Sequence, residues 1–175
     1  MTTDLDLLMI DIQKGEENAF GELYRITKDK VFYTALSIVR DRGIAEDIMQ
    51  ETYIKVRRSI NSYKKDTKPL NWIISIARNT AINEFNRRKR EMPVDTEASE
   101  YLFPTGDGGM ESSDSVRYMM KFLDSDERQV VTLHAVSGFK HWEIADIVGK
   151  PLGTVLWIYS KGIKKLKKAL KEDEL

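Results

Sequence analysis

The chain has 175 residues, 41% of them hydrophobic and 32% charged, so it can form one or two small domains with buried cores. It has no cysteine, which excludes disulfides and thiolate metal sites, and its two histidines are too few for a typical metal site. No apolar run approaches the roughly 18 residues that a membrane span requires, and no secretory signal is visible. These features fit a cytoplasmic protein without a metal or other cofactor.

The formal net charge of zero conceals a segregation of charge along the chain. Residues 64–90 carry eight cations and two anions, and residues 160–171 carry six lysines and no acid. Between them, residues 91–115 carry seven anions and no cation. Two basic stretches separated by an acidic one indicate two surfaces that face nucleic acid, joined by a tether.

The hydrophobic pattern is helical nearly throughout, and strand-like alternation is scarce. Residues 61–68 form a polar loop, and residues 92–114 combine proline, glycine and acidic side chains in the manner of a flexible linker. Helical periodicity covers residues 4–14, 16–27, 29–40, 43–60, 69–90, 128–137, 141–148 and 152–170. The sequence therefore predicts an all-α chain in two parts.

The predicted helix 43–60 has a second face beside its buried stripe. Asp47, Gln50, Glu51 and Ile54 share this face at helical spacing. Such a mixture suits protein docking, although an ordinary solvated face can have the same composition. Paired acids can also serve general acid–base catalysis, but no catalytic histidine, nucleophile or phosphate-binding loop accompanies them. An enzyme is therefore not expected.

The predicted helix 69–90 has two faces of different character. Its apolar stripe, which must be buried, consists of Leu70, Ile73, Ile74, Ala77, Ala81 and Phe85. The other side carries Trp72, Asn79, Asn83 and Arg87, and the helix ends in a cationic run. Rings that stack, amides that contact base edges and cations that hold phosphate are typical of nucleic-acid binding. A helix with a solvated polar face is the alternative.

Residues 142–163 have the spacing of a helix-turn-helix unit. Ala145 is followed by Gly149, Val155 and Ile158 at intervals of 4, 10 and 13 residues, and Pro151 separates the two helices. An ordinary helical hairpin is the alternative. The second helix is predicted to enter the major groove, with Lys164 and Lys165 on phosphates. Its outward positions near the start are Thr154, Leu156, Trp157, Ser160 and Lys161.

Three segments in this order resemble bacterial sigma factors of the extracytoplasmic-function type. They are AEDIMQETYIKV from residue 45, WIISIARNTAINEFNRR from residue 72 and LDSDERQVVTLHAVSGFKHWEIADIVGKPLGTV from residue 123. The resemblance implies a sigma-2 helical bundle at 1–91, a flexible acidic linker at 92–114 and a sigma-4 helix-turn-helix domain at 115–175. It also implies a factor that directs core RNA polymerase to promoters and is not itself an enzyme.

The resemblance assigns roles to matching positions. Docking on the β′ clamp helices falls to Asp47, Gln50, Glu51 and Ile54, while sigma-4 would meet the β flap. The −10 element, with one base flipped out, falls to Tyr63, Lys64, Trp72, Arg78, Asn79, Asn83, Arg87 and Arg88. The −35 duplex falls to Thr154, Leu156, Trp157, Ser160, Lys161, Lys164 and Lys165. An anti-sigma factor, often bound to the membrane, is the further partner that the resemblance implies.

The chain departs from the family pattern at the start of its last helix. After GTV, relatives commonly carry Lys or Arg, then Ser, then Arg, whereas this chain has Leu156, Trp157 and Ile158. Asn83 stands where many relatives carry Asp. A stand-alone helix-turn-helix regulator that binds duplex DNA without polymerase is the main alternative, and an interaction protein with exposed apolar helices is the other.

Overall fold

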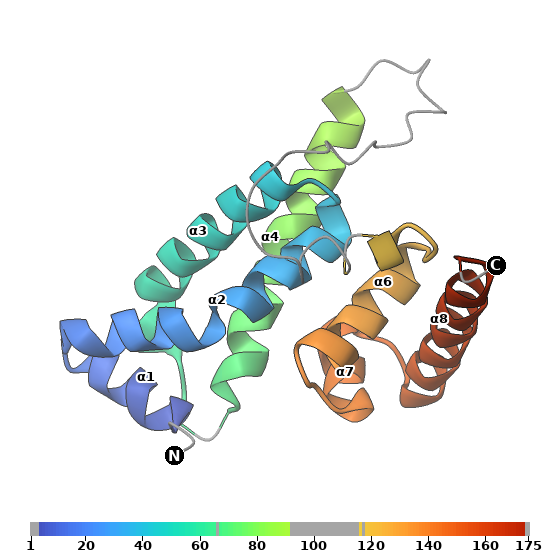
Figure 1. Ribbon diagram of the computed structural model, residues 1–175. Coiled ribbons are helices and arrows are strands. Elements are labelled where there is room, and N and C mark those ends of the chain that lie inside the picture. Colours follow the sequence, from blue (N-terminus) through green and yellow to red (C-terminus); the bar gives the residue numbers. More distant parts are fainter. Residues whose placement is uncertain (1–3, 66, 92–115, 117, 174–175) are drawn as a thin grey trace.

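The computed structural model describes residues 4–65, 67–91, 116 and 118–173, and within these residues it contains helices and no strand (Figure 1). The all-α prediction is confirmed. The predicted linker 92–114 lies outside the described residues. The elements are α1 (Leu5–Gln13), α2 (Glu17–Val39), α3 (Arg42–Ser59), the 3-10 turn η1 (Ile60–Ser62), α4 (Pro69–Glu91), α6 (Ser125–Val131), the π-helical turn η2 (Thr132–Val136), α7 (His141–Val148) and α8 (Leu152–Asp173).

The sequence predicts two helices at 16–27 and 29–40, whereas the structure has the single helix α2. Leu23, Thr27 and Val31 follow at intervals of four and are fully buried, so an unbroken helix keeps one buried stripe. The hydroxyl of Thr27 donates within the helix to Leu23 O and lies 2.7 Å from the Tyr53 hydroxyl, which satisfies its polar group inside the core. The charged residues 28–30 include no helix breaker, so nothing interrupts the helix there.

Side-chain caps set the starts of several helices. Asp4 caps α1 and Asp41 caps α3, each by accepting a backbone N–H of the first turn. Asp124 and Glu127 form a reciprocal capping box at the start of α6. This box starts α6 at Ser125, three residues before the predicted start at 128.

Helices α1 to α4 pack as the amino-terminal bundle. The predicted stripe of α4 is largely confirmed, because Ile73, Ile74, Ala77 and Ala81 are fully buried. Leu70 is half-buried against the core, whereas Phe85 is 38% exposed, so its predicted burial is wrong. Figure 1 shows the reason, since the carboxyl end of α4 projects past the neighbouring helices.

Helices α6 to α8, with η2, form the carboxyl-terminal unit. Val155 is fully buried and Ile158 is nearly so, as the helix-turn-helix spacing predicts, whereas Ala145 is half-buried beside the fully buried Ile144. Gly149 ends α7 in the left-handed conformation at φ 67°, where glycine has no steric cost. A Cβ at Gly162 would lie 3.0 Å from Val131 Cγ2, so this glycine lets α8 approach α6 closely.

The bundle and the carboxyl-terminal unit share one hydrophobic core. Val130, Leu133 and Ile144 of the unit belong to the same cluster of buried residues as Ile73 and Ile74 of the bundle. Figure 1 shows α6 and α7 between the bundle and α8, which lies on the outer side. The unit therefore rests on the bundle through α6, η2 and α7, and α8 lies on the far side of the unit.

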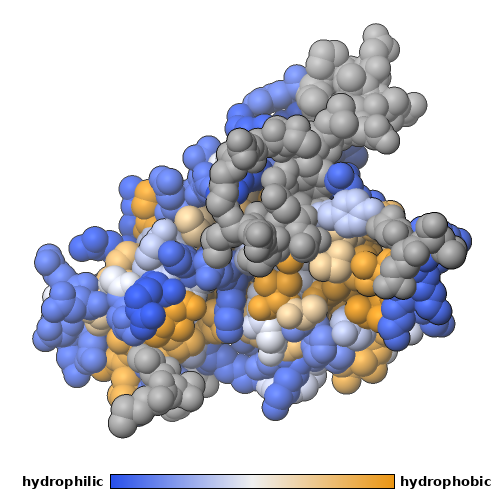
Figure 2. Space-filling view, viewed as in Figure 1, coloured by the Kyte–Doolittle hydropathy of each residue, from blue (hydrophilic) through white to orange (hydrophobic). Residues whose placement is uncertain are grey.

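Figure 2 shows a mainly hydrophilic surface, with hydrophobic side chains in separate areas over the bundle and over the carboxyl-terminal unit. No helix in the described part of the chain is long and apolar enough to cross a membrane. Among the same residues, no three His, Cys, Asp or Glu side chains group as a metal ion would require.

Candidate polymerase and nucleic-acid interfaces

The face of α3 predicted to dock on polymerase is open to solvent. Asp47, Gln50, Glu51 and Ile54 are all exposed, and Ile54 is 51% exposed although it is aliphatic. Ile44, Ile48, Thr52, Val56 and Ile60, on the other side of the helix, are buried as the sequence predicts. Packing of α3 against α2 and α4 therefore fixes the exposed face rigidly, which suits a docking surface.

A groove of about 240 Å³ lies between α3 and α4 beside this face. Asp47 and Glu51 line one side, and Glu84, Arg87 and Arg88 line the other. Arg87 and Arg88 donate to Glu84 at 2.7 to 3.0 Å, and these hydrogen bonds lower the pKa of Glu84 to about 2. Arg87 and Arg88, both predicted to contact DNA, are thus paired with the Glu84 carboxylate. To bind a DNA phosphate, each arginine must give up this carboxylate.

The polar face of α4 is partly open. Asn79 and Asn83 are exposed, whereas Trp72 and Arg78 are half-buried. Exposed carboxamides on one helix face can donate to and accept from base edges. Asn79 and Asn83 therefore share an accessible surface, whereas Trp72 and Arg78 are only partly accessible.

Tyr63, predicted to hold a flipped base, is 5% exposed. Its hydroxyl donates to the Asp6 carboxylate, and its ring packs on Trp72 with 5.6 Å between ring centres. Burial and the bond to Asp6 raise the pKa of Tyr63 to about 12. Gln13 holds the loop in place by donating to Ile60 O and Tyr63 O. The ring has to leave this site before it can stack on a base, whereas Lys64 in the same loop is exposed.

The carboxyl-terminal unit covers part of the same region of α4 and its preceding loop. Arg78 Nε donates to Gln129 Oε1 at 3.0 Å. Lys68 Nζ lies 3.3 Å from the centre of the Trp142 ring and 3.7 Å from Glu143 Oε1. These contacts, with the shared core, are called the unit interface below. In this arrangement, the side chains of Arg78 and Lys68 are committed to the unit interface.

Arg128 ties the unit interface to α2. Its Nε donates to Ser37 O at 3.2 Å, and its NH1 donates to Leu123 O at 2.6 Å. Burial, together with the nearby charge of Arg40, lowers the pKa of Arg128 to about 10. A buried guanidinium that bonds carbonyls of both units gives the interface a specific geometry.

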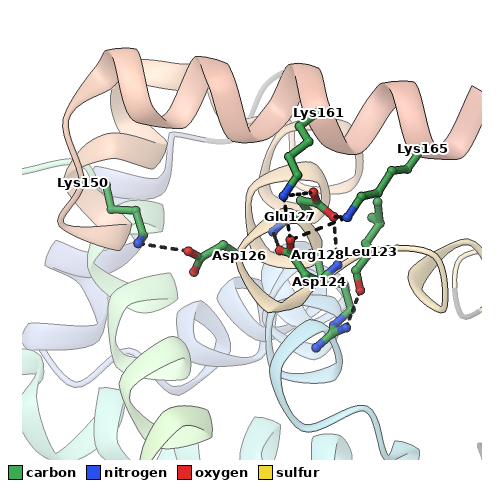
Figure 3. A network of polar contacts seen from close by, with 8 residues as sticks. All are labelled: Leu123, Asp124, Asp126, Glu127, Arg128, Lys150, Lys161 and Lys165. Carbon is green, nitrogen blue, oxygen red and sulfur yellow. Dashed lines mark hydrogen bonds and ion pairs between the residues drawn. The ribbon is translucent and has the colours of Figure 1, made fainter.

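The residues of α8 predicted to meet the −35 element fall into two groups. Thr154, Leu156, Trp157, Ser160 and Lys164 are exposed. Lys161 and Lys165 are half-buried and turn toward acids at the start of α6 (Figure 3). The sequence analysis missed these acids as lysine partners, although the pattern Asp124 to Glu127 is a capping signature that places both carboxylates at one helix end.

Glu127 is the centre of this polar network. Its carboxylate lies 3.1 Å from Lys161 Nζ and 2.7 Å from Lys165 Nζ, and it also accepts the backbone N–H of Asp124. Burial acts to raise the pKa of Glu127, but the Lys165 and Asp124 hydrogen bonds outweigh it, so the pKa is lowered. The charged carboxylate holds α6 and α8 together (Figure 3).

Glu127→Gln should lower the free energy of unfolding by about 1–2 kcal/mol, because the anion that faces two lysines is lost and glutamine has one acceptor oxygen in place of two. The cost is moderate since both lysines are partly exposed and can hydrate. Chemical denaturation at neutral pH measures it. Asp126→Asn is the matched control, because the Asp126–Lys150 pair at 3.1 Å is exposed and should contribute about 0.5 kcal/mol or less. Equal losses in the two variants would contradict this account of Glu127.

Two histidines and a tyrosine pack together inside the carboxyl-terminal unit. The rings of His134 and His141 stack with 4.2 Å between centres, and Tyr159 of α8 meets both edge-on. His134 Nδ1 lies 2.8 Å from Phe139 O. Burial and the nearby His134 lower the pKa of His141, so the fold favours the neutral imidazole.

The melting temperature should fall as pH drops from 7.5 to 5.5. The unfolded chain binds a proton at His141 near the ordinary pKa of about 6.5, whereas the folded chain resists it, so this stability is full above that pH and is lost below it. His141→Phe keeps a ring in the stack and removes the titration. Its melting temperature should therefore fall less over the same range. An identical pH dependence in wild type and variant would refute the assignment.

Comparison with known proteins places the chain in a family. Residues 23–91 match the model of sigma-70 region 2. The extracytoplasmic-function RNA polymerase sigma-E factor of Salmonella typhimurium is 31% identical over 163 residues, which cover 85% of each chain. The chain belongs to the extracytoplasmic-function sigma factors. SigW of Bacillus subtilis, a relative of the same type, is 26% identical over 92% of this chain and 94% of its own.

Two solved structures share the fold. CnrH, determined in complex with the cytosolic domain of CnrY, superimposes with a TM-score of 0.72 at 20% identity, over 97% of this chain and 99% of its own. RpoE of Bartonella quintana, determined with the anti-sigma factor NepR, gives a TM-score of 0.70 at 24% identity, over 87% of this chain and 96% of its own. As a sigma factor, the chain binds core RNA polymerase and directs it to specific promoters.

Proposed function

We propose that the exposed face of α3 docks this sigma factor on the clamp helices of the β′ subunit. The observation that carries the proposal is the grouping of Asp47, Gln50, Glu51 and Ile54 on one rigid, solvent-exposed face. An aliphatic side chain surrounded by acids and an amide provides both a buried contact and charge complementarity to a basic partner. A stand-alone regulator of duplex DNA has no use for such a surface.

Promoter opening is the task of the bundle, taken as a sigma-2 domain of residues 1–91. The exposed Asn79 and Asn83 supply amides for bases of the −10 element, and Trp72 supplies a ring. Lys64, Arg78, Arg87 and Arg88 supply cations for phosphates. Extruding one base costs a few kcal/mol, which stacking and amide contacts can offset. RNA synthesis itself belongs to the polymerase, and this chain contributes no catalytic group.

The carboxyl-terminal unit, taken as a sigma-4 domain of residues 115–175, reads the −35 element as duplex through α8 and meets the β flap. The two promoter elements lie about 25 base pairs apart, or roughly 85 Å along B-form DNA. The bundle and the unit touch in this structure, so they cannot hold both elements at once. Promoter recognition therefore requires the unit interface to open, which also releases Lys68 and Arg78.

The structure of the sigma factor RpoE with the anti-sigma factor NepR supports an anti-sigma factor as a further partner of this chain. Such a partner, when anchored in the membrane, would hold the sigma factor at the cytoplasmic side. The proposal places the free chain in the cytoplasm, where the polymerase acts.

Reconstitution with purified core enzyme tests the proposed function. Transcription of a fragmented genomic library, followed by mapping of RNA 5′ ends, should give discrete start sites that share −10 and −35 elements. Core enzyme alone is the control and should give none of these sites. A start-site map that the chain leaves unchanged would contradict the proposal.

A further inference from the structure

The start of α8 presents an apolar surface where a DNA reader normally presents polar groups. Trp157 is 63% exposed and Leu156 is 46% exposed. Residues 152–160 contain no charged side chain and no carboxamide. Arginine or lysine on guanine and asparagine or glutamine on adenine make the usual bidentate contacts to bases. None of these side chains is present in the first turns of this helix.

The outward face of α8 changes character along its length. Val155, Ile158 and Gly162 face the core. On the opposite side, Leu156 and Trp157 come first, Ser160 follows, and Lys164 begins a run of exposed lysines. In a helix-turn-helix unit the first residues of the second helix meet base edges, whereas later positions meet the backbone. The apolar pair therefore lies where bases are read, and the lysines supply the charge that DNA requires.

The lysine nearest to this pair is held by other groups. Lys161 Nζ lies 3.3 Å from Asp124 Oδ2 and 3.1 Å from Glu127 Oε1, and 5.2 Å from the centre of the Trp157 ring. The charge of Lys161 is thus balanced by acids of the same unit. The ammonium group lies beside the Trp157 ring and does not extend beyond it. The first turns of α8 therefore keep their apolar character, although Lys161 follows them directly in the sequence.

We propose that Leu156 and Trp157 select the −35 element by contact with the C5-methyl groups of thymines in the major groove. The proposal rests on α8 as the −35 reader. The thymine methyl is the apolar group that a base pair presents in that groove. Burying one methyl corresponds to about a fourfold gain in affinity. Selectivity through methyl groups should also depend little on salt, because no counterion is released by these contacts.

Deoxyuridine tests the proposal directly, since it lacks only the methyl of thymidine. Promoters from the start-site map are synthesised with uracil in place of individual −35 thymines, and holoenzyme affinity is measured by competition. Uracil at the contacted positions should weaken wild-type binding about fourfold each. Leu156→Ala and Trp157→Ala should weaken binding to the thymine promoter and reduce or remove the difference between thymine and uracil.

Lys164→Ala is the matched control on the same face. It should weaken thymine and uracil promoters equally and reduce the slope of log affinity against log salt by about 1. A wild-type holoenzyme that binds both promoters equally would overturn the proposal. Unchanged promoter affinity in both apolar variants would also overturn it and would assign the patch to a protein partner. Failure to use any promoter would instead overturn the proposed function.

Discussion

Replacing Asp47 with arginine is expected to reduce the affinity for core RNA polymerase by about 100-fold. The side chain is exposed at the amino-terminal end of the α3 face, so the change puts a cation where the proposed surface offers an anion, and like-charge contacts cost several kcal/mol. Gln50→Ala removes an amide from the same face and should have a smaller effect in the same direction. Titration of labelled sigma factor with core enzyme measures both.

Glu46→Arg is the control for this substitution. It makes the same charge change on the same helix, but Glu46 lies off the face and pairs with Arg42 at 3.0 Å on the surface. Its affinity for core enzyme should stay within about twofold of wild type, because surface pairs of this kind contribute little. If Asp47→Arg and Glu46→Arg bound core enzyme equally well, the docking face would lie elsewhere.

Locking the unit interface should abolish promoter-specific transcription. The chain has no cysteine, so Lys68→Cys and Glu143→Cys would be its only thiols. The two native side chains meet at 3.7 Å, so a short bismaleimide can join the introduced thiols. Because the locked units cannot span roughly 85 Å between promoter elements, the crosslinked protein should give no more specific transcript than core enzyme alone.

The same double variant without crosslinker controls for the lost contacts and for the Glu143 capping bond to Lys140 N. It should keep most of the wild-type transcription, since the Lys68–Glu143 pair is partly exposed. Single-cysteine variants treated with the same reagent control for modification of one thiol. Full activity of the crosslinked chain would show that the units do not need to separate.

The sequence predicts the fold well where a feature is periodic. Buried stripes in α3 and α4 follow from helical spacing alone, and the glycine and apolar positions of 145–158 place the turn of the helix-turn-helix unit. The break expected between residues 27 and 29 is wrong, because α2 runs through this point and Thr27 is buried with its hydroxyl bonded to Leu23 O. Burial of a bonded threonine depends on its neighbours in space, which a single sequence does not display.

In the candidate site too, some features follow from helical periodicity and others depend on residues that are distant in the sequence. Exposure of the proposed docking face of α3 and of Asn79 follows from helical periodicity. The partners of charged and aromatic side chains do not, because they come from distant parts of the chain. Tyr63 is bonded to Asp6, which lies 57 positions away, and Lys165 is bonded to Glu127, 38 positions away. Pairing of this kind decides which cations are free to meet DNA, and only the folded structure reveals it.

The contact between bundle and carboxyl-terminal unit lies entirely beyond sequence reasoning. In the sequence, Gln129 and Trp142 have the pattern of ordinary helix residues, yet in the structure they contact Arg78 and Lys68 of the bundle. The acidic stretch between the units suggests two separate parts, whereas one cluster of buried residues includes side chains of both units.

The most direct test of the central claim is permanganate reactivity of thymines on a mapped promoter. Permanganate oxidises unpaired thymines, so it reports strand separation base by base. Holoenzyme reconstituted with the wild-type chain should make thymines around −10 reactive. Core enzyme alone, or the sigma factor alone, should leave them protected. Equal reactivity with and without the chain would contradict the account that this sigma factor opens promoters only as a subunit of RNA polymerase.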